Sequence, residues 1–100
     1  MLSILIVEDD ITFSLMLTTW LGKKGFVVRS SSSVSDAKRR LGEGAFDLVI
    51  SDLRLPDSDG IDLLKWLKST HPSLPLIMMT SYAEIQTAVQ AMKLGAADYI

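Results

Sequence analysis

The chain has 100 residues, of which 48% are hydrophobic and 22% charged, with a formal net charge of -2 and no cysteine. This composition predicts one compact domain and excludes disulfide bonds and thiolate metal sites. The small negative charge gives no general attraction to nucleic acid or anionic lipid, and no apolar run reaches the roughly 20 residues of a membrane span. We therefore expect a soluble, cytoplasmic protein.

Apolar periodicity predicts strands and helices in strict alternation along the chain. The first strand ends at three acidic residues, and the helix that follows it closes at Gly25. The central strand ends at Asp52, before a loop rich in Pro, Asp, Ser and Gly. The expected strands are residues 2–7, 26–28, 48–50 leading into Asp52, 75–79 and 98–100. The expected helices are residues 11–24, 61–70 and 85–94, together with a helix capped by Ser33 or Ser35 that runs to about Leu41.

This alternation, with short connections, predicts an α/β fold in which helices cover both faces of a doubly wound, five-stranded parallel sheet. Such a fold normally closes with a helix after the fifth strand, and the sequence as given lacks that final helix. We therefore expect the sheet face beside the first helix to be incompletely covered. The chain would then be weakly stable or would self-associate.

Oxygen-bearing side chains stand where three neighbouring strands end. Glu8 and Asp9 follow the first strand, Asp52 the third and Thr80 the fourth. These residues should meet, because the carboxyl ends of parallel strands share one edge, where ligands bind. Clustered carboxylates repel one another unless a hard cation such as Mg²⁺ neutralises them. An aspartate beside Mg²⁺ can attack phosphorus, so this pattern indicates phosphoryl chemistry at Asp52.

Four motifs together resemble a two-component response-regulator receiver domain, over essentially all of residues 1–100. They are Glu8-Asp9, Asp52 with Leu55-Pro56 and Asp59-Gly60, Thr80-Ser81, and Gly95-Ala96-Ala97-Asp98-Tyr99. The resemblance implies the strand order 2-1-3-4-5. It implies Asp52 as the phospho-acceptor, Thr80 as the switch hydroxyl and Tyr99 as the switch aromatic.

The same resemblance implies a magnesium site and a signalling role. Mg²⁺ would be held by Glu8, Asp9, Asp52 and the backbone carbonyl of Arg54, with Glu8 acting through water. The phosphoryl donor would be a sensor histidine kinase or a phosphotransfer protein. Phosphorylation would reshape the face of the fourth helix and fifth strand to control an output, for which transcription is expected, and homodimerisation stays open. The domain itself would bind neither nucleic acid nor membrane, and would catalyse only its own phosphorylation and dephosphorylation.

Receiver domains also carry a lysine that pairs with the acyl phosphate, and its position here would be residue 102, beyond Ile100. We therefore expect residues 1–100 to be a receiver domain that is incomplete at its C-terminal end, with any output domain outside the sequence. Such a chain would bind Mg²⁺ but would be phosphorylated slowly or not at all.

Each candidate residue also has a purely structural interpretation. Asp52 would cap the loop after its strand, Glu8 and Asp9 would cap the first helix, Thr80 would cap the fourth, and Tyr99 would pack against the sheet. Asp10 fits the role of helix cap better than that of metal ligand. Trp20 and Trp66 fit the packing of helices on the sheet.

Three other classes of protein stay open from the residues alone. A phosphatase or mutase of the haloacid-dehalogenase kind would need a second aspartate at the position of Arg54. A flavin or nucleotide binder would need a phosphate-cradling loop after the first strand, where the acidic run stands instead. An interaction module that works without phosphorylation would be distinguished by a failure to bind Mg²⁺.

Overall fold

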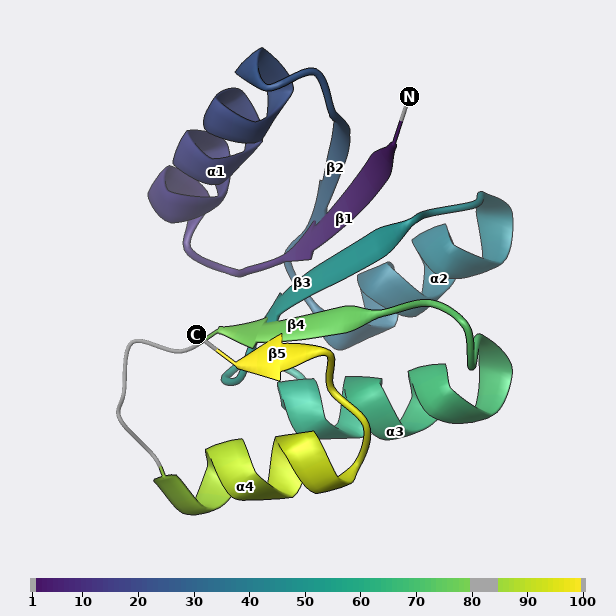
Figure 1. The fold of residues 1–100 in the computed structure, drawn as a ribbon. Coiled ribbons are helices and arrows are strands. Elements are labelled where there is room, and N and C mark those ends of the chain that lie inside the picture. Colours follow the sequence, from purple (N-terminus) through teal and green to yellow (C-terminus); the bar gives the residue numbers. More distant parts are fainter. Residues whose placement is uncertain (1, 80–84, 100) are drawn as a thin grey trace.

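The computed structural model describes residues 2–79 and 85–99, in which strands and helices alternate along the chain (Figure 1). The strands are β1 Ser3–Val7, β2 Val27–Ser31, β3 Leu48–Asp52, β4 Leu76–Met79 and β5 Asp98–Tyr99. The helices are α1 Ile11–Lys23, α2 Val34–Glu43, α3 Gly60–Thr70 and α4 Ile85–Lys93. All strand pairs are parallel, in the order β2-β1-β3-β4-β5. The predicted doubly wound parallel arrangement is therefore confirmed. In this part of the chain no helix is long and apolar enough to cross a membrane.

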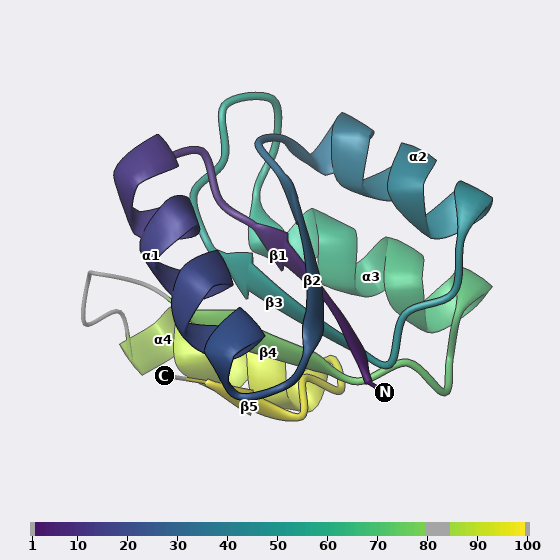
Figure 2. The same ribbon diagram turned by 90° about the horizontal axis from the view of Figure 1, so that it is seen from above.

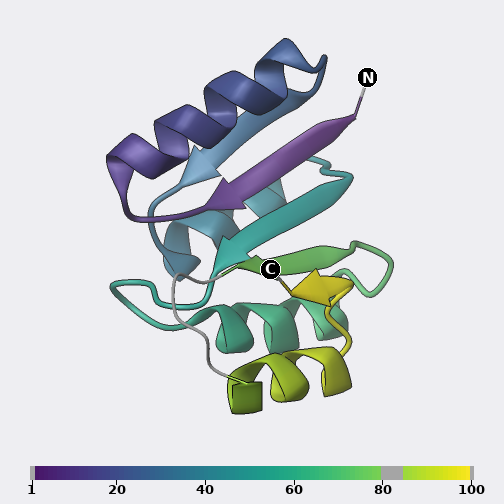
Figure 3. The same cartoon turned by 60° about the vertical axis from the view of Figure 1, so that its left-hand side comes forward.

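The helices divide unequally between the two faces of the sheet. Helix α1 covers one face, and α2, α3 and α4 cover the other (Figures 1 and 3). The larger core lies on the three-helix face, where fully buried Leu63, Leu64 and Leu67 of α3 pack with Leu5 and Val49 of the sheet. Most of the apolar burial that stabilises the fold is therefore on that face.

The α1 face is less completely covered. Leu21 of α1 is buried there with Ile4 and Ile6, but Leu48 and Ile50 of the sheet are only partly buried. This confirms that the sheet face beside α1 is incompletely covered. The expected weak stability or self-association stays a prediction.

Helix α1 also carries apolar side chains that do not face the sheet. Ile11 is 81% exposed and Leu15 65% exposed. Trp20 is 57% exposed, and the Lys24 ammonium lies 5.2 Å from its ring centroid. The prediction that Trp20 packs against the sheet is therefore wrong. Trp66 does pack against the core of the other face.

Short-range hydrogen bonds and glycines set the ends of the helices. The Asp10 side chain accepts a hydrogen bond from the Phe13 N–H at 3.1 Å, so its expected role as the cap of α1 is confirmed. Gly25 and Gly95, with φ of 96° and 101°, follow α1 and α4 as predicted. Positive φ is the conformation in which glycine commonly ends a helix.

Strand β2 differs from its predicted position. It begins at Val27 and runs to Ser31, whereas the predicted strand covers residues 26–28. Ser31 pairs with Val7 of β1, and the backbone hydrogen bonds of the sheet outweigh the weak strand preference of serine. As a consequence, the end of β2 lies level with the end of β1.

Gly60, the first residue of α3, lies against the end of β3. A Cβ atom added there would stand 2.5 Å from the Asp52 carbonyl oxygen and 2.6 Å from the Met78 sulfur, whereas one added at Gly42 of α2 would meet no atom within 4 Å. We expect Gly60→Ala to lower the free energy of unfolding by about 1–3 kcal/mol because of this overpacking. Gly42→Ala should raise it by up to about 1 kcal/mol through helix propensity.

Urea unfolding of both variants checks this expectation. If Gly60→Ala and the unchanged protein have the same free energy of unfolding, the end of β3 can move away from α3 without destabilising the fold.

Candidate functional site

Three acidic side chains meet at the carboxyl edge of the sheet. Val7 of β1 pairs with Ser51 of β3, so the residues that follow Val7 lie beside Asp52. One carboxylate oxygen from each of Glu8, Asp9 and Asp52 lies within 4.8 Å of the other two. The structure therefore brings together the three acids that the sequence predicts at one site.

Glu8 is the most buried of these acids, at 8% exposure. Burial raises its pKa to about 8, and a hydrogen bond to Asp52 and the negative charges of Asp52 and Asp9 act in the same direction. The backbone N–H of Asp10 opposes this change. One oxygen of Glu8, Oε2, is buried without a hydrogen-bond partner among the described residues. An unpaired buried carboxylate oxygen beside two other carboxylates fits a hard divalent cation such as Mg²⁺.

Asp52 is half-buried and is oriented by the chain next to it. The Leu53 N–H donates to its Oδ1 at 2.7 Å, and the Ser51 hydroxyl donates to its carbonyl oxygen at 2.9 Å. A hydrogen bond from the backbone to the carboxylate limits its rotation. The side chain is therefore held in place before any ligand arrives.

The loop between β3 and α3 is closed at its base. The Gly60 N–H donates to the Leu53 carbonyl oxygen at 2.7 Å, and Arg54 forms an antiparallel bridge with Asp59. Arg54, which was expected to contribute its carbonyl, is exposed and stands two residues beyond Asp52.

The two expected switch residues fall outside what the structure describes in full. Strand β4 ends at Met79, which pairs with Asp52, and Thr80 lies outside the described residues. Tyr99 belongs to β5 and pairs through its backbone with Met78, but its side chain is not in the described part of the chain.

Asp57 takes part in a connection that the sequence did not predict. Its Oδ1 accepts a hydrogen bond from the Val34 N–H and its Oδ2 one from the Ser35 N–H, both at 2.9 Å. The composition of this segment, rich in Pro, Asp, Ser and Gly, predicts only a loop. Because these hydrogen bonds join residues that are 22 and 23 positions apart, no short-range spacing in the sequence predicts them. The Asp59 cap of α3, which accepts from the Asp62 N–H, does have such a signal in its three-residue spacing.

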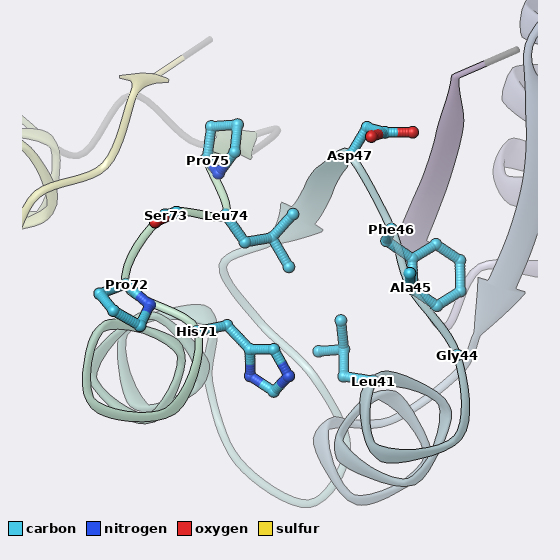
Figure 4. A pocket seen from close by; sticks show the side chains of 10 residues that line it. All are labelled: Leu41, Gly44, Ala45, Phe46, Asp47, His71, Pro72, Ser73, Leu74 and Pro75. Atoms are coloured by element: carbon cyan, nitrogen blue, oxygen red, sulfur yellow. The ribbon is translucent and has the colours of Figure 1, made fainter.

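Two hollows lie at opposite ends of the sheet. One of about 460 Å³ borders Glu8 and lies between α1, the end of β2 and α2. The other, of about 380 Å³, lies where residues 44–47 and 71–75 lead into β3 and β4, and His71, Leu41 and Leu74 face it (Figure 4). Because parallel α/β sheets bind ligands at the carboxyl edge, the hollow beside Glu8 is the one adjacent to the candidate site.

Comparisons with known proteins agree with this geometry. The family model described as the response regulator receiver domain matches residues 4–100. The chain is 38% identical over 96 residues to the response regulator protein PilR of Pseudomonas aeruginosa, covering 96% of this chain and 22% of that protein. It is 39% identical over 99 residues to the transcriptional regulatory protein ZraR of Escherichia coli strain K12, covering 99% of this chain and 22% of that protein.

A solved structure shows the same fold. The non-phosphorylated HemR receiver domain from Leptospira biflexa matches with a TM-score of 0.94 and 35% identity, over 100% of this chain and 81% of that chain. The chain thus corresponds to 81% of a solved receiver domain but to 22% of the length of the curated relatives named above. From the family model and these relatives, we conclude that this chain belongs to the response regulator receiver domain family.

Proposed function

We propose that Asp52 accepts a phosphoryl group in a two-component phosphorelay, at a site that holds Mg²⁺. The observation that carries this proposal is the approach of the Glu8, Asp9 and Asp52 carboxylates to within 4.8 Å at the edge of the sheet. Those three side chains and the Arg54 carbonyl would hold the ion. When bound, Mg²⁺ would neutralise charge on the phosphoryl oxygens.

The donor in this proposal is a phosphohistidine of a sensor kinase or phosphotransfer protein, or a small acyl phosphate. A carboxylate oxygen of Asp52 attacks phosphorus, and the bond from phosphorus to the donor breaks. Its electron pair stays on the imidazole nitrogen of a phosphohistidine, or on the carboxylate oxygen released from an acyl phosphate. Such transfers depend mainly on positioning and on neutralising charge. The Leu53 N–H supplies part of the positioning, because it holds Asp52 Oδ1 at 2.7 Å.

The response would pass through Thr80 and Tyr99 to the face formed by α4 and β5. A new phosphoryl charge would draw in the Thr80 hydroxyl and let Tyr99 turn inward. On the described part of α4, Ala91 is buried while Val89 and Met92 are 48% and 49% exposed, so the helix presents apolar surface that a partner would contact.

The output in this proposal is transcription, controlled in the cytoplasm by a domain other than residues 1–100. Its support is the printed name of the relative ZraR, a transcriptional regulatory protein. The receiver domain itself would contact neither nucleic acid nor membrane.

A direct consequence of this proposal is phosphorylation at Asp52. We expect intact-mass measurements after prolonged incubation with acetyl phosphate and Mg²⁺ to show slow addition of one phosphoryl group, which Asp52→Asn abolishes. Asp47→Asn is the matched control, because Asp47 immediately precedes β3 at its opposite end and the amide can still accept from the Ser3 N–H. Addition that survives Asp52→Asn, or that is lost equally in Asp47→Asn, would contradict the proposal.

A further consequence concerns the pH dependence of stability. In metal-free protein, Glu8 has a pKa of about 8, against an ordinary value of 4.5. Between these pH values the folded chain keeps a proton that the unfolded chain has lost, so the contribution of Glu8 to the free energy of unfolding falls as pH rises. We expect Glu8→Gln to remove this fall, while Glu43→Gln on exposed α2 surface leaves it unchanged.

Urea unfolding in the presence of a chelator measures how the free energy of unfolding changes with pH. The measurements cover roughly pH 5 to 8.5, in steps of about one pH unit. Because a carboxylate must lose its proton to bind a metal, Mg²⁺ should also bind more tightly as pH rises through this range. If the free energy of unfolding depends on pH in the same way in Glu8→Gln and in the unchanged chain, Glu8 is ionised in the folded, metal-free chain.

A further inference from the structure

The start of α2 is tied to the loop that follows β3. Val34 and Ser35, the first two residues of α2, donate their backbone N–H groups to the two oxygens of Asp57 at 2.9 Å. Figure 2 shows this loop beside the start of α2. The Ser35 and Val34 N–H groups hold the pKa of Asp57 below its ordinary value, so the carboxylate is charged at neutral pH. The connection is a charged carboxylate on two backbone donors at the positive end of a helix.

Helix α2 already has a cap of its own. The Ser33 side chain accepts from the Asp36 N–H at 3.1 Å, and the Ser33 carbonyl accepts from the Ala37 N–H at 3.0 Å. These are the ordinary bonds of a helix N-terminus. The first N–H groups of a helix have no partner within the helix, and water can satisfy them. What Asp57 adds is therefore mainly a link between the helix and the loop after Asp52.

The hydrogen bonds from α2 to Asp57 fix the tip of the loop after Asp52, which the bonds at the base of that loop do not reach. At the base of the loop, the Gly60 N–H binds the Leu53 carbonyl. Further out, the Leu55 N–H binds the Ser58 carbonyl at 3.2 Å, which closes a turn. Asp57 lies inside this turn, so its bonds to α2 hold the tip. Arg54 lies between the base and the tip, and both restraints therefore limit how its backbone can rotate.

We propose that Asp57 is a positioning residue for the phosphoryl-acceptor site: by anchoring the tip of the loop on α2, it fixes the direction of the Arg54 carbonyl toward the cation. This inference rests on the proposed function of Asp52 and Arg54. Outer groups that orient a metal ligand strengthen metal binding without touching the ion. Asp57 acts in this way through the backbone of its own loop.

The test compares two variants at the same helix end. Asp57→Ala removes the link between loop and helix, whereas Ser33→Ala removes a capping bond of α2 and leaves the link intact. In calorimetric titration with Mg²⁺ alone, we expect Asp57→Ala to weaken binding about tenfold and Ser33→Ala to leave it unchanged. Asp57→Asn, which keeps one acceptor oxygen, should fall between Asp57→Ala and the unchanged chain. Urea unfolding of all variants confirms that each is folded.

Amide hydrogen exchange at Leu55 in metal-free protein provides a second measurement. We expect faster exchange in Asp57→Ala but not in Ser33→Ala, because only the first variant frees the turn. Unchanged Mg²⁺ affinity in Asp57→Ala, or equal weakening in both variants, would overturn the proposal and leave Asp57 as a helix cap. If the unchanged chain binds no Mg²⁺, the proposed function fails and the role toward the cation fails with it. Exchange at Leu55 then still decides whether Asp57 anchors the loop.

Discussion

The repulsion between three carboxylates at one edge of the sheet is the constraint on which the rest of this site depends. Parallel pairing of β1 with β3 places Glu8 and Asp9 beside Asp52, and their oxygens come within 4.8 Å. Without a cation, the folded chain reduces the repulsion by keeping a proton on Glu8, whose pKa is raised to about 8. A divalent cation would perform the same neutralisation and release that proton. A proton and a divalent cation would therefore compete for this site.

Much of the fold follows from patterns that are local in the sequence. Apolar runs such as residues 48–50 predict buried strands, and Gly25 and Gly95 predict the ends of helices, because each acts over a few residues. The meeting of Glu8, Asp9 and Asp52 is also predictable, since parallel strands in one sheet bring their ends to one edge. The strength of these predictions comes from backbone geometry, which is much the same in every sheet of this kind.

Other features depend on which segments meet in three dimensions. Ser31 is a strand residue because Val7 pairs with it, which no property of serine indicates. Asp57 bonds to α2 because two loops come together at the carboxyl edge. On α1, the apolar pattern shows a helix but not its orientation: Ile11 and Leu15 are exposed, while Ser14 is buried. A single helix on a partly covered face has fewer neighbours to determine which of its side chains are inside.

The residues that join β2 to α2 are hydrogen-bonded to two loops that lie far apart in the sequence, the loop after β1 and the loop after β3. At the start of this segment, the Ser31 carbonyl accepts from the Glu8 N–H at 2.9 Å, which fixes the turn that carries the acidic pair. At its end, the Val34 N–H binds Asp57 of the loop after Asp52. The loop after β1 and the loop after β3 are thus both held by the same short segment. Because both loops are bonded to residues 31–34, a shift of one loop would have to be accommodated at the same segment that holds the other.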